Sequence, residues 1–239
     1  NQNRLYANTG REYYYGNIPS INLDKIIIPY KQLWKRYKAE APEYATDPVS
    51  FQKTRKDSTK VVSYLAKEFE LRKNADQMKR TSIAKTGELN MSKIYSYVFN
   101  EDIFKKATVV AEGKSHGLVM FLDWSGSMSE NINNTVKQLI NLTLFCKKVN
   151  IPFDVYAFSS EYGQHDWMKE TWKDGNIYLD KCNLLNILSN RMSASEYSYA
   201  CGALLYMTTG HHRLDWFCLG GTPLNEAVIA AMEIIPEFK

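Results

Sequence analysis

The spacing of hydrophobic residues changes near residue 117 and divides the chain into two parts. Upstream of this point, apolar residues recur every three to four positions in a long polar stretch; they are Val61, Leu65 and Phe69, with Val62 and Ala66 on a neighbouring face. This spacing is that of an amphipathic helix. It predicts one long helix from about Asp57 to about Ile83.

Shorter elements are predicted around this helix. The segment that begins near Pro29 and ends before Pro42 favours a helix, because proline is tolerated in a first turn but not in a helix interior. Gly87 breaks the long helix, and Met91–Val98 favours a second short one. Residues 1–25 are rich in Asn, Tyr, Gly and Ser without a sustained period, so we expect an irregular arm.

Downstream of Gly117, two continuous apolar runs flank an amphipathic segment. The first run, GLVMFLD, ends at Asp123, and the second, FDVYAFS, covers Phe153–Ser159. Between them, one helical face is marked by Ile132, Val136, Leu139, Ile140, Thr143 and Leu144. A strand, a helix and a strand at this spacing predict a βαβ unit. The predicted fold class is therefore α/β, with a doubly wound, mostly parallel sheet and a helical N-terminal extension.

The change of pattern also predicts a division into domains. Residues 1–56 form an irregular and helical N-terminal arm, residues 57–116 a helical extension, and residues 117–239 the α/β domain. A chain of 239 residues can bury a sizeable core, and 44% hydrophobic with 23% charged residues is typical of a soluble globular protein.

Charge is placed unevenly along the chain. Residues 1–116 carry 21 Lys and Arg against 13 Asp and Glu, whereas the remainder carries 9 against 13. The basic charges are interleaved with acids in helix-like stretches, and no nucleic-acid-binding module signature is present. The pattern favours a solvated basic face that meets an acidic partner surface over a nucleic-acid interface.

Membrane and redox signals are both weak in this sequence. No apolar run approaches the roughly 18–20 residues that span a bilayer, and no secretory signal pattern precedes the first helix. Cys146, Cys182, Cys201 and Cys218 show no CxxC pair or metal-ligand spacing. We therefore expect reduced thiols and a cytoplasmic location.

The candidate chemistry follows the first apolar run, in the stretch LDWSGSMSE. Asp123, Ser125 and Ser127 form the pattern D-x-S-x-S, in which alternate residues of an extended loop can point their oxygens to one side. Ligands of open α/β sheets bind beyond the carboxyl ends of the strands, which is where this loop lies. One carboxylate and two hydroxyls suit Mg²⁺ or Mn²⁺ far better than zinc. The alternative is structural: the serines cap the following helix and Asp123 accepts turn amides.

A second oxygen-bearing loop, LGGTPL, precedes the helix-like run NEAVIAAMEII. Its two glycines allow close approach of the backbone, and Thr222 is the candidate fourth ligand. By itself, Thr222 would be interpreted as a helix cap.

These stretches resemble the von Willebrand factor A (VWA) domain, whose metal-ion-dependent adhesion site (MIDAS) uses D-x-S-x-S, a threonine from a second loop and an aspartate from a third. The segment RKNADQMKRTSIAKTGELNMSKIYSYVFNEDIFKK is similar to the corresponding region of the large VWA-containing subunit of aerobic cobaltochelatase and its phage-encoded relatives. The resemblance covers roughly Asp57 to Lys239. It implies that Asp123, Ser125, Ser127 and Thr222 hold Mg²⁺ or Mn²⁺. It also implies a C-terminally incomplete sheet, whose last strands and third-loop aspartate would follow Lys239.

The resemblance also implies a function. The bound metal ion would accept an acidic side chain from a partner protein, and a MoxR-type AAA+ ATPase is one expected partner. The chain would then be a non-catalytic adaptor subunit of a cobaltochelatase-like complex.

Two alternatives stay open. The same fold could serve as a structural component of a large assembly such as a phage virion, with the tyrosines Tyr13–Tyr15 contacting a neighbour. A serine at a strand-to-helix turn also resembles a hydrolase nucleophile, and four histidines, His116, His165, His211 and His212, are available as bases. However, the sequence has neither G-x-S-x-G nor HExxH, which disfavours a hydrolase.

Overall fold

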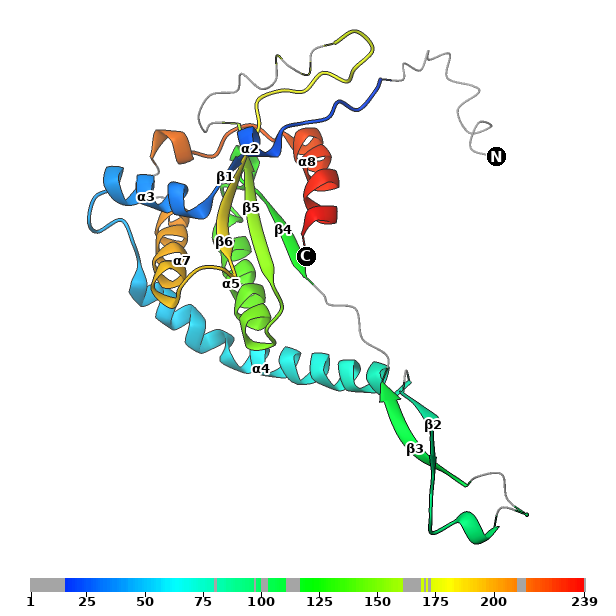
Figure 1. The fold of residues 1–239 in the computed structure, drawn as a ribbon. Coiled ribbons are helices and arrows are strands. Elements are labelled where there is room, and N and C mark those ends of the chain that lie inside the picture. Colours follow the sequence, from blue (N-terminus) through cyan, green and yellow to red (C-terminus); the bar gives the residue numbers. More distant parts are fainter. Residues whose placement is uncertain are drawn as a thin grey trace, which may run out of the picture.

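The computed structural model describes residues 16–79, 81–96, 98–99, 103–110, 117–160, 169, 171, 173–209 and 214–238. The strands, in chain order, are β1 (Ile27–Ile28), β2 (Thr81–Leu89), β3 (Phe104–Val110), β4 (Leu118–Asp123), β5 (Phe153–Ser159) and β6 (Asn183–Ser189). The α-helices are α2 (Leu23–Ile26), α3 (Tyr30–Glu40), α4 (Pro48–Lys79), α5 (Ile132–Lys148), α7 (Ala194–Thr208) and α8 (Leu224–Glu237). The fold is mixed α/β (Figure 1).

The main sheet has four strands in the order β1-β6-β5-β4. β4 pairs with β5 in parallel and β1 pairs with β6 in parallel, while β5 and β6 are antiparallel. The prediction of a mostly parallel α/β sheet is thus confirmed at this level, and the antiparallel pair is an addition to it. The apolar run of β6 carries no information on its direction, which depends on how the connecting segment returns to the sheet.

The predicted βαβ unit is confirmed as β4, α5 and β5. On α5, the side chains of Ile132, Val136, Ile140 and Thr143 are fully buried, as the helical face predicted. Every residue of β5 and β6 is buried because helices cover both faces of the sheet, which explains why these strands are apolar without alternation. Each fully buried Leu, Ile or Phe contributes about 1.5–3 kcal/mol to folding.

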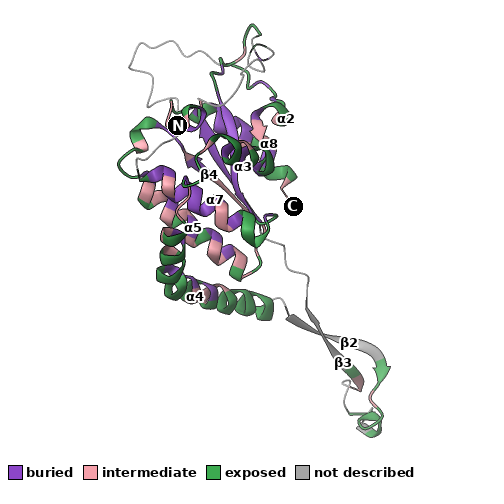
Figure 2. Cartoon of the chain, turned by 90° about the vertical axis from the view of Figure 1, so that its left-hand side faces the viewer, coloured by how far each residue is buried: buried purple, intermediate pink, exposed green. Residues whose placement is uncertain are grey.

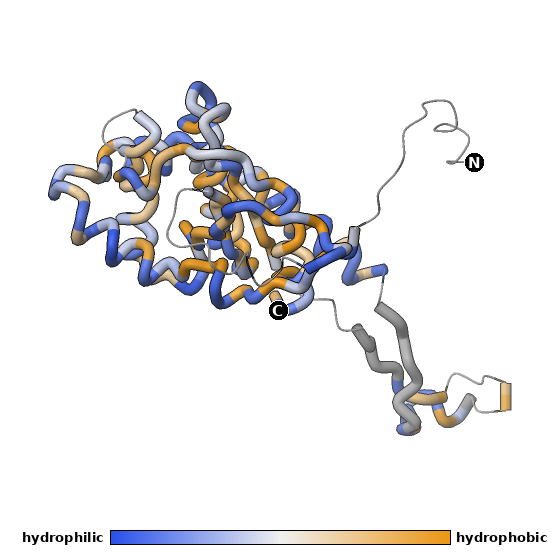
Figure 3. The backbone as a smooth tube through the Cα atoms, turned by 90° about the horizontal axis from the view of Figure 1, so that it is seen from above, coloured by the Kyte–Doolittle hydropathy of each residue, from blue (hydrophilic) through white to orange (hydrophobic). Residues whose placement is uncertain are grey.

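Helices form layers on both faces of the main sheet. α3, α5 and α7 contribute to one core cluster with β4, β5 and β6, and α4 packs on the outer side of α5 and α7. α2 and α8 cover the opposite face, where Ala230 and Ile234 pack near Tyr156 and Phe158. Figure 2 shows the buried residues on the strands and on the inner helix faces, and Figure 3 shows the hydrophobic segments gathered inside the body.

The long helix differs from its prediction. α4 begins at Pro48 rather than near residue 57 and ends at Lys79, so the predicted continuation to Ile83 is wrong. The buried face of α4 contains Phe51, Ser58, Val62 and Ala66. In the stripe that was predicted to be buried, Val61 is 52% exposed and Leu65 is 40% exposed, because α5 and α7 contact the neighbouring face.

An antiparallel hairpin replaces the predicted helical extension beyond residue 80. β2 pairs with β3 in a register that joins Thr81 to Val110 and Leu89 to Phe104, with an irregularity between Lys85 and Leu89. Within 91–98, where a short helix was predicted, the described residues form turns and a 3₁₀ helix at Ile94–Ser96. The β-branched residues Thr81, Ile83 and 108–110 are of a type that favours strands. The local hydrophobic pattern does not reveal the pairing, because the two strands are separated in sequence.

The N-terminal segment is packed into the α/β body. The predicted helix between Pro29 and Pro42 is confirmed as α3, and the indole Nε1 of Trp34 donates a hydrogen bond of 2.9 Å to the carbonyl oxygen of Ile187 on β6. β1, which was not predicted, extends the sheet beyond β6. The division into 1–56, 57–116 and 117–239 stays a prediction, and Tyr13–Tyr15 lie outside the described residues.

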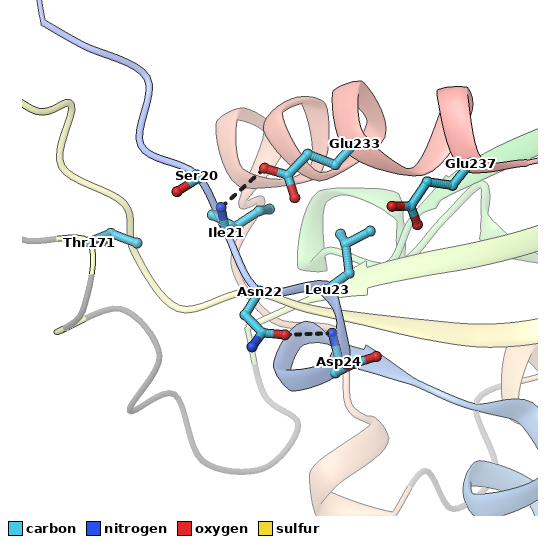
Figure 4. A pocket seen from close by; sticks show the side chains of 8 residues that line it. All are labelled: Ser20, Ile21, Asn22, Leu23, Asp24, Thr171, Glu233 and Glu237. Atoms are coloured by element: carbon cyan, nitrogen blue, oxygen red, sulfur yellow. Dashed lines mark hydrogen bonds between the residues drawn. The ribbon is translucent and has the colours of Figure 1, made fainter.

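The segment before β1 is also fastened to α8. The backbone nitrogen of Ile21 donates to Glu233 Oε1 at 3.2 Å, and Asn22 Oδ1 accepts from Asp24 at 3.0 Å to cap α2 (Figure 4). A hollow of about 600 Å³, lined in part by acidic side chains, lies between this segment and α8. Glu233 therefore has a structural role, since it satisfies a backbone donor of the incoming chain.

One edge of the sheet and one face of α8 are open in the described part of the chain. β4 is an outermost strand, so the polar groups on one side of its backbone pair with no described strand. On α8, four apolar side chains are more than half exposed and lie at helical spacing: Leu224, Val228, Met232 and Ile235. The ring of Phe238 lies against Gly117, which places the end of α8 beside the beginning of β4.

None of the described helices has both the length and the apolar character that crossing a membrane requires.

Candidate functional site

The D-x-S-x-S loop leaves the carboxyl end of β4, as predicted. Asp123 is the last residue of β4 and pairs in register with Phe158 of the parallel strand β5. Ser159 at the end of β5 and Asn183 at the start of β6 face each other in the same register and are both buried. Polar residues therefore collect at this edge of an otherwise apolar sheet.

The two serines of the motif lie next to each other. Their Oγ atoms, on Ser125 and Ser127, are 3.0 Å apart, which is a hydrogen-bond distance. Ser125 is 1% exposed and Ser127 is exposed, so the pair reaches from the buried edge to the surface. Gly126 begins a 3₁₀ helix, Gly126–Met128, that bends the loop and turns both hydroxyls to the same side.

The structure brings the second predicted loop to the first. Ser125 and Gly220 form an isolated parallel bridge, in which Gly126 N donates to Gly220 O at 2.9 Å. Thr222 is two residues beyond this bridge, is exposed, and directly precedes Pro223 and α8. Segments nearly a hundred residues apart in sequence thus form one rim, and all four predicted ligand residues lie on it.

Trp124 holds the two loops together, and sequence reasoning missed it. Its side chain is fully buried, and its Nε1 donates a hydrogen bond of 3.0 Å to the carbonyl oxygen of Phe217. The ring centroids of Trp124 and Phe217 are 5.1 Å apart. Because neighbouring residues in an extended chain point to opposite sides, burying Trp124 directs Asp123 and Ser125 the other way. A tryptophan inside an otherwise polar loop was the available signal.

Ser160 is a second residue that sequence reasoning missed. It follows β5, and its Oγ accepts a hydrogen bond of 2.9 Å from the backbone nitrogen of Gly221. A Cβ atom at Gly221 would lie 3.4 Å from this Oγ, in ordinary van der Waals contact, so the two loops approach closely here. The signal was its position at the carboxyl end of the neighbouring parallel strand.

Asp123 carries the feature that distinguishes this rim. Its Oδ1 atom is buried and has no hydrogen-bond partner among the described residues. An unpaired buried carboxylate oxygen is costly, and such atoms are usually paired or bound to a cation. The residues fit a hard divalent ion, because this oxygen, the two adjacent serine hydroxyls and the nearby Thr222 are all oxygen donors. The described residues contain no cluster of three or more His, Cys, Asp and Glu, so an ion here would keep much of its positive charge.

The capping alternative finds no support at these positions. Ser125 occupies the position before the 3₁₀ helix but makes no side-chain cap there, and α5 follows Asn131 without a side-chain cap. The position before α8 is Pro223, again without a side-chain cap. The hydroxyls of the rim are therefore not used to cap these helices.

A serine hydrolase needs a base such as a histidine, and all four histidines of this chain lie outside the described residues. Among the described residues, the side chain of Ser125 is hydrogen-bonded to another serine hydroxyl, which does not activate a nucleophile as an imidazole does.

The fold and the rim define the class of this protein as a mixed α/β domain with an oxygen-rich loop site at the carboxyl edge of its sheet. Comparisons of the chain with protein-family models, with curated proteins and with solved structures found no match.

Proposed function

We propose that this chain is a divalent-metal-dependent protein-interaction module of the VWA type, with a MIDAS formed by Asp123, Ser125, Ser127 and Thr222. The buried Oδ1 of Asp123, which has no hydrogen-bond partner among the described residues, carries the proposal together with the two paired serine hydroxyls of the same loop. Mg²⁺ or Mn²⁺ at this position would supply a Lewis acid. This chain's own residues would hold the ion, and a carboxylate from a partner protein would complete its coordination.

The shortage of negative charge in the rim explains why a partner would be needed. A single carboxylate neutralises only half of a divalent charge, and hydroxyl oxygens neutralise none of it. An acidic side chain of another protein then completes the coordination, and binding to that protein becomes metal-dependent. The resemblance to the large cobaltochelatase subunit extends the proposal to a non-catalytic adaptor that works with a MoxR-type AAA+ ATPase in the cytoplasm.

The direct test is Mn²⁺ binding, followed by electron paramagnetic resonance. The wild-type chain should bind one Mn²⁺ ion that Mg²⁺ displaces, and Asp123→Ala should not bind it. Asp215→Ala is a matched control, because Asp215 is exposed on the approach to the second loop and is not a predicted ligand. Equal Mn²⁺ binding by the wild type and both variants would reject the site.

A second measurement tests the partner. A purified MoxR-type AAA+ ATPase should co-sediment with the wild-type chain in Mg²⁺ and separate from it in EDTA. Co-sedimentation that is unchanged by EDTA and by Asp123→Ala would exclude a metal-dependent contact with that ATPase.

A structural role in a large assembly, such as a virion, is the second candidate. The open edge of β4 and the exposed apolar stripe of α8 favour it, since edges and apolar patches of this kind mark association surfaces. Sedimentation velocity separates the two candidates. Metal-independent growth into large species would favour assembly.

A further inference from the structure

A groove of about 630 Å³ lies between α3 and the beginning of α7, apart from the residues of the proposed metal site. One wall carries Lys31, Lys35 and Lys38, which are all exposed and follow one face of α3 at helical spacing. Within the described part of the chain, none of their ammonium groups forms an ion pair with a carboxylate. The groove therefore presents a row of three available positive charges that extends about 10 Å along the helix.

The floor of the groove is aromatic. Tyr30 and Trp34 are only 9% and 8% exposed, and Tyr199 forms the partly buried side next to them. Trp34 and Tyr199 meet edge to face, with ring centroids 6.2 Å apart. This floor offers contact area to an apolar side chain, while the lysines form its charged rim.

The opposite wall carries a single carboxylate, against the three ammonium groups of α3. Glu196 lines it, but its carboxylate accepts a 2.9 Å hydrogen bond from the backbone nitrogen of Ser193 in a capping box at the start of α7. Hydrogen bonds from Ser193, with a smaller effect from Lys31, lower the pKa of Glu196. The ionised carboxylate is held at the helix start, and because it faces three lysines the groove keeps a positive balance.

We propose that this groove binds an acidic amphipathic segment of a partner protein. Acidic residues at positions i, i+4 and i+7 of a partner helix repeat the spacing of the three lysines, and an apolar side chain between them fits the aromatic floor. Three of the basic residues of the segment 1–116 are thereby assigned to one binding site. The inference does not depend on the proposed metal site.

Protein is favoured over nucleic acid by the packing of Trp34. Single-stranded nucleic acid binds through exposed aromatic faces on which bases stack. The ring of Trp34 is instead enclosed by edge contacts with Tyr37, Tyr199 and Phe217, and its Nε1 is bonded to Ile187. With Trp34 only 8% exposed, the floor offers a small apolar contact and no free stacking platform.

The test measures the binding of a fluorescein-labelled synthetic helix of about 18 residues, long enough to be helical in solution. It carries Glu at i, i+4 and i+7 beside a leucine stripe. The triple variant Lys31→Gln, Lys35→Gln and Lys38→Gln should bind it about tenfold more weakly than the wild type, since three exposed ion pairs contribute modestly each. The matched control replaces Lys53, Lys56 and Lys60, which are exposed on α4, by Gln; it should change binding less than about twofold.

Two further arms separate this groove from general charge attraction. A peptide with Gln in place of Glu should bind about as weakly as the α3 triple variant, and Tyr199→Ala should weaken the Glu peptide without changing its salt dependence. Equal losses in the α3 and α4 triple variants, or equal binding of the Glu and Gln peptides, would overturn the proposal. So would an oligothymidine that binds more tightly than the Glu peptide and depends on the same three lysines.

Discussion

The indole Nε1 of Trp124 donates a hydrogen bond of 3.0 Å to the carbonyl oxygen of Phe217, and this contact joins the two loops of the candidate metal site. Trp124→Phe should lower the free energy of unfolding by about 1–3 kcal/mol, because it leaves a buried carbonyl unpaired and opens a small cavity. Urea unfolding followed by circular dichroism measures the loss. Trp216→Phe, whose lost partner is the exposed carboxylate of Glu40, should have a smaller effect.

Asp123→Asn tests whether the carboxylate is held without a partner. In EDTA this variant should be more stable than the wild type by about 0.5–1 kcal/mol, because the buried oxygen then carries no charge. Saturating Mg²⁺ should reverse the order, since an ion at ten times its dissociation constant stabilises the wild type by about 1.4 kcal/mol. Thermal unfolding with Mg²⁺ and with EDTA gives both results. A less stable Asp123→Asn in EDTA would show that the wild-type carboxylate is satisfied.

Arg191 and Asp154 form an ion pair of 2.8 Å in which the side chain of Asp154 is 5% exposed and that of Arg191 is 62% exposed. Arg191→Ala should cost about 1–3 kcal/mol, chiefly because it leaves a buried carboxylate without its cation. Adding Asp154→Asn should recover part of this loss, as measured in a double-mutant cycle. If the two effects simply add, the pair contributes no coupling energy.

The buried thiols predict a loss of stability at alkaline pH. Burial raises the pKa of Cys146 from 9.0 to about 11 and that of Cys201 to about 12. The unfolded chain therefore releases these protons first, so their contribution is complete below pH 9 and is lost as the pH rises through about 11 to 12. Urea unfolding between pH 8 and about pH 11 should show this decline, and Cys201→Ala should make it shallower. An unchanged slope in Cys201→Ala would assign the decline to other groups.

The exposed stripe of α8 predicts self-association. Val228 and Met232 are 52% and 57% exposed beside the open edge of β4, so concentrated protein should form small oligomers through this face, even if it forms no large assembly. Val228→Glu with Met232→Glu should reduce this association in sedimentation velocity. The matched pair on α4, Val61→Glu with Met78→Glu, should leave it unchanged, because that helix does not adjoin the open edge. A wild type that is monomeric at every concentration would contradict the expectation.

Local pattern predicted the central βαβ unit and the helix after LGGTPL, but it did not predict β6 or α7, which complete the core. β4, α5 and β5 follow from two apolar runs and one amphipathic face, because each element buries a periodic set of its own residues. For α4, the pattern indicated a helix but not which stripe is buried, since Val61 and Val62 are equally apolar. The hairpin of β2 and β3 escaped prediction because its strands pair across a long insertion rather than by a short turn.

For the candidate site, D-x-S-x-S and LGGTPL indicated Asp123, Ser125, Ser127 and Thr222 because residue type and position after a strand can be read locally. The serine pair at 3.0 Å and the unpartnered Oδ1 of Asp123 could not be read in this way, since both depend on how the loops bend. Ser160 and Trp124 join the site through contacts with Gly221 and Phe217, which are more than sixty residues away in sequence.

The sequence by itself determined the type of fold, the central βαβ unit and four candidate ligand residues, because hydrophobic period and side-chain chemistry are local properties. The tertiary structure alone decided the direction of β6, the bridge between Ser125 and Gly220, and the burial of the Asp123 oxygen. It also decided that three lysines of α3 face an aromatic groove beside α7. These features depend on contacts between distant segments, and the free energy of such contacts is realised only when the whole core packs.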